Sequence, residues 1–216
     1  MTKCVALLGG SFDPVHKGHV ALAALFAQLL QPDQLRIVPA GNPWQKNGLH
    51  ASAEQRVAML ELAFADAGLA ITIDRQEIER GTPSYTIDTL RQVRAEVGPA
   101  ASIVFLMGAD QLQQLDSWRE WRSLFEVAHI GVGARPGFSL DDAALPAAVR
   151  EELQQRRAEP AQLRNTPSGL AYLARALDEE VSATDIRASL QRGADANSRL
   201  APVVLDYIQQ HNLYTT

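Results

Sequence analysis

Short apolar runs alternate with longer segments of helical periodicity along the first two thirds of the chain. The short runs are bounded by turn residues, which predicts strands that are buried on both faces. They cover residues 5–8, 35–38, 70–73, 102–107 and 130–132. Between them, apolar residues spaced three and four positions apart predict helices at 19–30, 52–67, 87–97 and 118–127.

Strand–helix alternation of this kind is typical of an α/β fold, with a Rossmann-like parallel sheet and helices on both faces. Such sheets bind ligands beyond the carboxyl ends of their strands. A local signal supports one of the helices, because Ser52 and Gln55 form a capping-box pattern at its start.

The last third of the chain has a different pattern. It predicts an exposed helix at 146–157, a short apolar segment at 170–173 that could add a strand, and helices at 182–191 and 201–211. We find no internal repeat and no clear interdomain linker. We therefore expect residues 1–216 to form a single domain with a C-terminal helical segment.

The composition restricts the classes of function. Of the 216 residues, 46% are hydrophobic, which is enough for a sizeable core, and the formal net charge is -5. A binder of nucleic acid usually has a basic surplus, so we expect no nucleic-acid partner. A small phosphorylated ligand needs only local positive charge and stays possible.

The chain also lacks the features of a secreted or membrane protein. Cys4 is its single cysteine, which excludes an internal disulfide and fits a reducing compartment. The apolar run at 5–8 is too short for the core of a signal peptide, and no stretch approaches the length of a membrane span. We expect a cytoplasmic protein without a membrane partner, and the oligomeric state stays open.

The strongest functional pattern lies between the first strand and the first helix, where the sequence reads GGSFDPVHKGH from residue 9 to residue 19. Gly9 and Gly10 allow a sharp turn and a close approach of the backbone to a ligand. The amides at the start of the following helix attract anions. The loop has neither the Gly-Lys-Ser/Thr ending of a P-loop nor the glycine spacing of a dinucleotide fingerprint.

His16 and His19 are three residues apart and can share one face of the first helical turn. Two imidazoles there could donate hydrogen bonds to phosphate oxygens that gain charge in a transition state. Two other interpretations stay open from the residues alone. One is a turn in which a single histidine caps or packs. The other is a metal site formed by Asp13, His16 and His19, for which we find no convincing fourth ligand.

Residues 10–19 resemble the signature of the nucleotidyltransferase superfamily with the T/HxGH motif. Within it, the chain is most similar to the bacterial nicotinate-nucleotide adenylyltransferases, along nearly its whole length. The resemblance implies transfer of the adenylyl group of ATP to nicotinate mononucleotide in NAD biosynthesis, giving nicotinate adenine dinucleotide and pyrophosphate. It also implies Mg²⁺ carried by ATP, without a dedicated protein cage for the metal.

The segment from Ser182 to Arg187 resembles the family's phosphate-binding Ser-Ser-Thr-x-Ile-Arg motif, with Ala183 in place of the second serine. Ser182 is a plausible N-cap of the helix that follows. Thr184 and Arg187 share a helical face, and Arg187 offers a planar fork for phosphate oxygens. Without the resemblance, an ordinary capped helix with a solvated arginine would explain the same residues.

Two segments resemble nicotinate-binding elements of the family. In the first, Ser84 and Tyr85 lead into a helix, and the amide of Thr86 corresponds to the group that meets the nicotinate carboxylate. Free amides at a helix start suit a carboxylate. In the second, Trp118 corresponds to the tryptophan that stacks on the pyridine ring, and the amide of Arg119 is the second donor.

Three further matches lie after predicted strands. Gly108 and Asp110 match the family's Gly-x-Asp near the nucleoside of ATP, and Arg135 begins an Arg-Pro-Gly turn. Lys46 ends a loop in which the family has a His-Lys pair, and Gln45 replaces the histidine here. A turn arginine in solvent would explain Arg135 nearly as well.

The resemblance therefore implies three groups of site residues. The catalytic group is His16, His19 and Arg187. The ATP-binding group is Gly9, Gly10, Ser11, Phe12, Gly18, Gly108, Asp110, Arg135, Ser182, Thr184 and Ile186. The group for nicotinate mononucleotide is Lys46, Ser84, Tyr85, Thr86, Trp118 and Arg119.

Four rival functions share parts of this pattern. They are a phosphopantetheine adenylyltransferase, an enzyme that prefers nicotinamide mononucleotide, a nucleotide sensor without catalysis, and a metal-dependent hydrolase. The segments at Thr86 and Trp118 disfavour the first. The helix-start amides disfavour the second, because they suit a carboxylate better than a neutral amide. The two histidines together with Arg187 disfavour the sensor.

Overall fold

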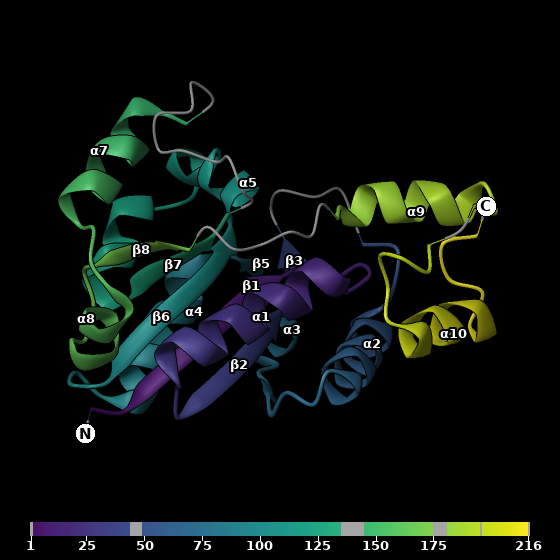
Figure 1. Cartoon of the computed structure of the whole chain (residues 1–216), viewed down its shortest axis with the longest axis horizontal. Coiled ribbons are helices and arrows are strands. Elements are labelled where there is room, and N and C mark those ends of the chain that lie inside the picture. Colours follow the sequence, from purple (N-terminus) through teal and green to yellow (C-terminus); the bar gives the residue numbers. More distant parts are fainter. Residues whose placement is uncertain (1, 44–48, 135–144, 175–180, 195, 216) are drawn as a thin grey trace.

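A six-stranded parallel sheet forms the centre of the molecule (Figure 1). The computed structural model describes residues 2–43, 49–134, 145–174, 181–194 and 196–215. The strand order is β4-β2-β1-β6-β7-β8. The strands are β1 (Cys4–Gly10), β2 (Gln34–Pro39), β4 (Thr72–Ile73), β6 (Ser102–Gly108), β7 (His129–Gly133) and β8 (Ala171–Ala174). The predicted parallel sheet is confirmed, with each strand shifted or resized by a few residues.

Helices cover both faces of this sheet because its central strands are apolar on both sides. Cys4, Ala6 and Leu8 of β1 belong to one core cluster, whereas Val5 and Leu7 belong to the other. The first cluster includes side chains of α1 (Lys17–Leu30), α2 (Ala53–Asp66), α8 (Pro160–Asn165) and α10 (Pro202–Gln210). The second includes side chains of α4 (Thr86–Val97), α6 (Leu124–Val127) and α7 (Ala147–Gln155).

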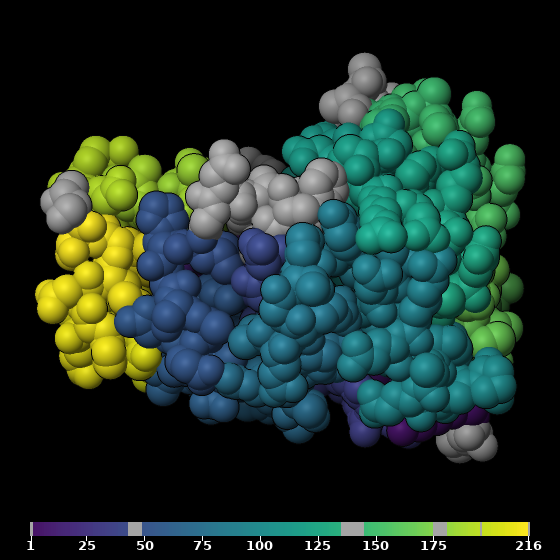
Figure 2. Space-filling model, turned by 180° about the vertical axis from the view of Figure 1, so that it is seen from behind, coloured from purple at the N-terminus to yellow at the C-terminus, as the bar shows by residue number. Residues whose placement is uncertain are grey.

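The C-terminal helices lie to one side of the sheet. Helix α9 (Ala183–Gln191) and α10 stand together beside α2, and the space-filling view from behind shows the same neighbourhood (Figures 1 and 2). Pro202 is the first residue of α10, a position that needs no backbone donor. The predicted C-terminal helices are therefore confirmed, and they pack on the domain through α2.

One predicted helix is wrong. Instead of a single helix over 118–127, the chain forms the 3-10 turns η1 (Leu115–Ser117) and η2 (Trp121–Ser123), followed by α6. Trp118 has an extended backbone, and Glu120 has a left-handed backbone with a φ of 50°. These two residues break the helix, although Trp121 is buried in the core as the apolar spacing predicted.

Several short elements escaped prediction because they are too brief to show periodicity. A separate two-stranded parallel ribbon pairs β3 (Asn42–Pro43) with β5 (Pro83–Ser84). The other short elements that we did not predict are α3 (Gln76–Arg80), α5 (Ala109–Leu112) and α8.

Side-chain signals at helix starts are clearer. Ser52 is the N-cap of α2, its hydroxyl oxygen accepts from the Gln55 amide at 3.2 Å, and the Gln55 side chain accepts from the Ser52 amide at 2.9 Å. The predicted capping box is confirmed.

Within the described residues, no helix is long and apolar enough to cross a membrane.

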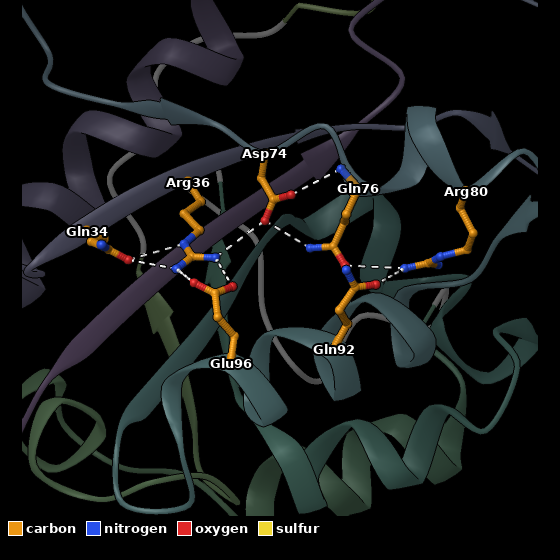
Figure 3. Close-up of polar contacts among 7 residues, drawn as sticks. All are labelled: Gln34, Arg36, Asp74, Gln76, Arg80, Gln92 and Glu96. Atoms are coloured by element: carbon orange, nitrogen blue, oxygen red, sulfur yellow. Dashed lines mark hydrogen bonds and ion pairs between the residues drawn. The ribbon is translucent and has the colours of Figure 1, made fainter.

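A polar network joins β2, the end of β4, α3 and α4 (Figure 3). The buried Arg36 guanidinium donates to both carboxylate oxygens of Glu96, at 2.7 and 2.6 Å, and lies 3.5 Å from the Asp74 carboxylate. Gln76 donates to Asp74 and accepts from Arg80. The network holds α3 against the outer strand β4 of the sheet. It thereby also positions the chain that leads from α3 to β5.

The pair between Arg36 and Glu96 gives a prediction about stability. The hydrogen bonds from Arg36 lower the pKa of the Glu96 carboxyl below its ordinary value of 4.5. A carboxylate of this kind contributes its full stability above the ordinary pKa, and the contribution is lost as the pH falls through the lowered pKa. Because the Glu96 side chain is 56% exposed, Glu96→Gln should lower the free energy of unfolding at neutral pH by less than about 1 kcal/mol.

Urea unfolding of the wild type and of Glu96→Gln across the acid range tests this. The difference should be full near neutrality and disappear as the pH falls through the lowered pKa of Glu96. Glu151→Gln, at an exposed position of α7, is the matched control. A difference between wild type and Glu96→Gln that is independent of pH would contradict the role given to the ion pair.

Candidate active site

The predicted ligand-binding residues gather where four strands end. Gly10 at the end of β1 pairs with Pro39 at the end of β2, and Gly108 at the end of β6 pairs with Gly133 at the end of β7. Because β1 also pairs with β6 in parallel, all four carboxyl ends lie on one edge of the sheet. The loops after these strands therefore open onto the edge at which parallel sheets bind ligands.

Glycines keep this edge free of side chains. A Cβ atom added at Gly10 would lie 3.0 Å from the ring of Phe12, and one at Gly108 would lie 2.5 Å from the Asp110 carboxylate. Phe12 itself is fully buried and has a left-handed backbone with a φ of 48°. The buried ring holds the turn after β1, so that the loop runs close along the sheet edge.

The two histidines of the motif lie face to face at the start of α1. Their ring centroids are 3.6 Å apart with an interplanar angle of 24°. His16 is the N-cap of α1, and its amide donates to Nδ1 of His19 at 3.2 Å. The absence of a side chain at Gly18 leaves space for the His16 ring, since a Cβ atom there would lie 3.2 Å from Nδ1 of His16. The spacing of three residues thus produces the predicted shared face.

The hydrogen bonds of Asp13 differ from those expected of a metal ligand. Its buried carboxylate accepts from the amides of His50 at 2.8 Å and Ala51 at 3.1 Å, and from the Tyr214 hydroxyl at 2.7 Å. These donors use both carboxylate oxygens. Within the described residues, no group of three or more histidine, cysteine, aspartate or glutamate side chains is arranged to hold a metal ion.

The start of α9 meets the glycine loop. The Arg187 guanidinium donates to the carbonyl oxygen of Asp13 at 2.7 Å and to Oγ1 of Thr184 at 3.3 Å. Ser182 is the N-cap residue, as predicted, but its side chain makes no capping hydrogen bond. Residues 174 positions apart are thereby brought together, and the Arg187 side chain ties α9 to the loop that carries the histidines.

A second arginine, which is buried, supports the same loop from α2. Arg56 is 1% exposed, and its Nη1 donates to the carbonyl oxygen of Ser11 at 2.8 Å. Burial lowers the pKa of this guanidinium, and the nearby Asp13 charge opposes that shift. Arg56 lies outside every recognised motif, and in the sequence it looks like an ordinary polar position of an amphipathic helix.

The segment before α4 is attached to the loop after β2. Oγ of Ser84 accepts from the amides of Gly41 at 3.2 Å and Asn42 at 3.3 Å. Behind it lies the buried Glu77 carboxyl, which accepts from Oγ1 of Thr89 at 2.7 Å. Burial raises the pKa of Glu77, and its hydrogen bonds to Thr89 and Ser84 oppose that rise. This support was not predicted, because Glu77 lies outside the recognised motif.

The predicted nicotinate-binding residues surround the start of α4. Thr86 is its first residue, and the N-cap residue Tyr85 makes no side-chain capping bond. The Arg119 guanidinium lies 4.8 Å from the centre of the Tyr85 ring and 3.8 Å from the Asp88 carboxylate. Helix α4 thus begins beside the turn that holds Trp118 and Arg119.

Trp118 is half-buried against the sheet. Its ring packs edge-on against Phe105 of β6, with 6.2 Å between the ring centroids. Its Nε1 is buried and has no hydrogen-bond partner among the described residues. Two predicted site residues, Lys46 and Arg135, lie outside the described residues, as do Trp44 and Gln45.

Comparison with known proteins gives a consistent result. The cytidylyltransferase-like family matches residues 7–189 of the chain. A protein of Herminiimonas arsenicoxydans named "Probable nicotinate-nucleotide adenylyltransferase" is 58% identical over 99% of this chain and 98% of its own length. A protein of Chromobacterium violaceum with the same name is 44% identical over 99% of this chain and 100% of its own length.

A solved structure shares the fold. Nicotinic acid mononucleotide adenylyltransferase of Plasmodium falciparum, complexed with NaAD, matches with a TM-score of 0.72 over 98% of this chain and 97% of that chain, at 21% sequence identity. At 21% identity, this likeness shows the fold alone. The two bacterial relatives are 58% and 44% identical over nearly the whole of both chains. The chain therefore belongs to the cytidylyltransferase-like family and, within it, to the nicotinate-nucleotide adenylyltransferases.

Proposed function

We propose that this chain transfers the adenylyl group of ATP to nicotinate mononucleotide and releases pyrophosphate and nicotinate adenine dinucleotide, a step of NAD biosynthesis. The observation that carries the proposal is the meeting of Arg187 with the loop that holds the stacked His16 and His19. This contact supports a site in which an arginine fork from α9 and the two imidazoles at the start of α1 act on the same phosphates.

ATP is assigned to the loops after β1 and β6 and to the start of α9. The glycine loop passes along the nucleotide phosphates, while Gly108 and Asp110 lie at the nucleoside. Arg187 and the α9 amides hold the β- and γ-phosphates. The full proposed set is Gly9, Gly10, Ser11, Phe12, Gly18, Gly108, Asp110, Arg135, Ser182, Thr184, Ile186 and Arg187.

The chemistry is an in-line displacement at the α-phosphorus. A phosphate oxygen of nicotinate mononucleotide forms the new bond, and the bond from the α-phosphorus to the oxygen that bridges to the β-phosphorus breaks. The acceptor phosphate is already anionic at pH 7, so positioning and charge stabilisation suffice. His16 and His19 donate to α-phosphoryl oxygens as these gain charge, and Arg187 stabilises the departing pyrophosphate.

We assign nicotinate mononucleotide to the residues around the start of α4, which we name the proposed nicotinate pocket. The amides of Thr86 and Arg119 bind the nicotinate carboxylate, and Trp118 stacks on the pyridine ring. Ser84 and Tyr85 are assigned to the same site, and Ser84 accepts hydrogen bonds from the loop after β2. Lys46 is assigned to the phosphate of this substrate.

Mg²⁺ enters as part of the nucleotide. Mg²⁺ carried by the nucleotide would neutralise phosphate charge and would need few protein groups to hold it. We assign residues 1–216 to one nucleotidyltransferase domain, since α9 supplies Arg187 to the loop after β1. The buried single thiol of Cys4 fits a cytoplasmic setting.

The choice of acceptor tests the proposal. Pyrophosphate release from ATP and Mg²⁺ should depend on an acceptor and be fastest with nicotinate mononucleotide, compared with nicotinamide mononucleotide and phosphopantetheine. Preference for another acceptor would keep the transferase but overturn the carboxylate pocket. No release with any acceptor, from folded protein that binds ATP, would overturn the proposed function.

Substitution of His19 is the most direct test of the proposed catalytic chemistry. His19→Ala should lower turnover by about a hundredfold or more, the usual cost of removing one transition-state donor. Because Nδ1 of His19 also accepts from the His16 amide, His19→Asn is needed as well, since its side-chain oxygen can replace that acceptor but not Nε2. Initial rates at saturating substrates measure both variants.

His211→Ala is the matched control, because His211 lies exposed at the end of α10. Both His19 variants should lose turnover while the control keeps it. Recovery of turnover in His19→Asn would reduce His19 to a capping residue of α1, and near-normal turnover in His19→Ala would remove it from the mechanism.

Trp118 tests the pyridine platform. Trp118→Ala should raise the KM for nicotinate mononucleotide by about tenfold, the usual scale of one lost stacking contact, and leave the KM for ATP nearly unchanged. Trp118→Phe should lie between the two, because it keeps part of the aromatic surface. An equal rise in both KM values would instead indicate a general loss of structure.

A further inference from the structure

Asp13 is a buried charge that lies three residues before His16. Only 2% of its surface is exposed, and its carboxylate accepts two backbone amides and the Tyr214 hydroxyl. A buried carboxylate is costly unless donors satisfy it. Two of these donors come from the connection before α2. The third comes from a residue 201 positions away in the sequence.

Tyr214 is built into the domain as this third donor. It is 6% exposed, and its hydroxyl lies 2.7 Å from Oδ1 of Asp13. Burial, together with the bond to Asp13, raises the pKa of the phenol, so the group stays a proton donor at physiological pH. The turn that returns Tyr214 to the domain holds Asn212 and Tyr214 at φ values of 49° and 59°. This backbone is unfavourable for non-glycine residues and therefore needs support from contacts.

A second connection runs from the C-terminal segment to the other side of His16. The Lys17 ammonium donates to the carbonyl oxygens of Ser198 at 2.9 Å and Asn197 at 3.3 Å, and the Lys17 amide donates to the Arg199 carbonyl at 3.0 Å. The positive charge inside the motif thus faces the main chain between α9 and α10. In this structure, Lys17 anchors the motif to that segment.

These bonds are placed where the sheet provides no support. Strand β1 ends at Gly10 and α1 begins at Lys17, so residues 11–16 belong to no regular element. Catalysis by oriented donors requires side chains to be held within a fraction of an ångström. The hydrogen bonds to Asp13 and Lys17 lie on the two sides of His16, and most of them come from residues 187–214.

We infer that the segment from α9 to Tyr214 is a positioning clamp for the catalytic histidines, with the Tyr214 hydroxyl as the anchor on Asp13. The inference rests on the proposed function for its effect on turnover. Tyr214 touches no reacting atom and acts through Asp13 and the loop. The clamp therefore controls the rate of the chemical step, while the nicotinate pocket at α4 is independent of it.

Tyr214→Phe is the test, because it removes one hydroxyl and keeps the buried ring. We expect kcat to fall by about tenfold or more, the scale of one hydrogen bond to a charged group, with the KM for nicotinate mononucleotide unchanged. Tyr207→Phe is the matched control, since it removes a hydroxyl from α10 that lies outside the Asp13 cluster. An unchanged kcat in Tyr214→Phe would overturn the clamp.

Hydrogen exchange of the unliganded protein supplies a readout that does not depend on activity. Peptides covering residues 11–19 and 50–52 should exchange faster in Tyr214→Phe and stay as in the wild type in Tyr207→Phe. An even rise of exchange across all peptides would reduce Tyr214 to a general stability residue and overturn the inference. An inactive wild type would refute the proposed function, whereas the exchange data would still decide whether the clamp exists.

Lys17→Met tests the positioning clamp if Tyr214→Phe does not fold. Lys17 is partly exposed, so the change removes the ammonium bonds without disturbing the core. It should speed exchange in residues 11–19 and 196–200 and lower kcat by about threefold, the scale of one ordinary hydrogen bond. Lys3→Met, at an exposed site before β1, is its control. Exchange and kcat equal to those of the wild type in Lys17→Met would overturn the clamp.

Discussion

The need to satisfy one buried carboxylate organises the site. Asp13 has almost no contact with water, so its charge depends on donors that the fold must supply. The donors belong to the connection before α2 and to the return of the chain after α10, while Arg56 lies nearby as a buried positive charge. The loop with the two histidines therefore takes its shape only when these distant parts are all in place.

The rest of the architecture consists of a rigid sheet and of the elements that surround the carboxyl ends of its strands. Central strands that are apolar on both faces fix the register, and the register places Gly10, Pro39, Gly108 and Gly133 along one edge. On one side of that edge, α1 and α9 bring cationic and imidazole groups together. On the other, Ser84 of the β3–β5 ribbon accepts from the loop after β2, just before α4 begins. In the proposed function, the two substrates bind between elements that are supported separately.

Local patterns in the sequence predicted what depends on local physics. Apolar runs and helical spacing predicted the parallel sheet and most helices, and the spacing of His16 and His19 predicted their shared face. The segment at 118–127 failed, because Glu120 adopts a left-handed backbone that no periodicity reveals. Tyr214, Arg56 and Glu77 were missed for a related reason. Their importance comes from partners in other elements of the fold, and each one looks ordinary among its neighbours in the sequence.

The distance along the chain between Asp13 and Tyr214 has a consequence for biosynthesis. Strand β1 and its loop are synthesised well before the tyrosine that completes their hydrogen bonds, which follows Asp13 by 201 residues. At ordinary rates of translation, that interval is about ten to forty seconds. During it, the carboxylate can remain hydrated and the loop unformed while the early strands and helices are already made. The loop that carries the two histidines, although it is synthesised before most of the domain, is therefore among the last parts of the domain to become ordered.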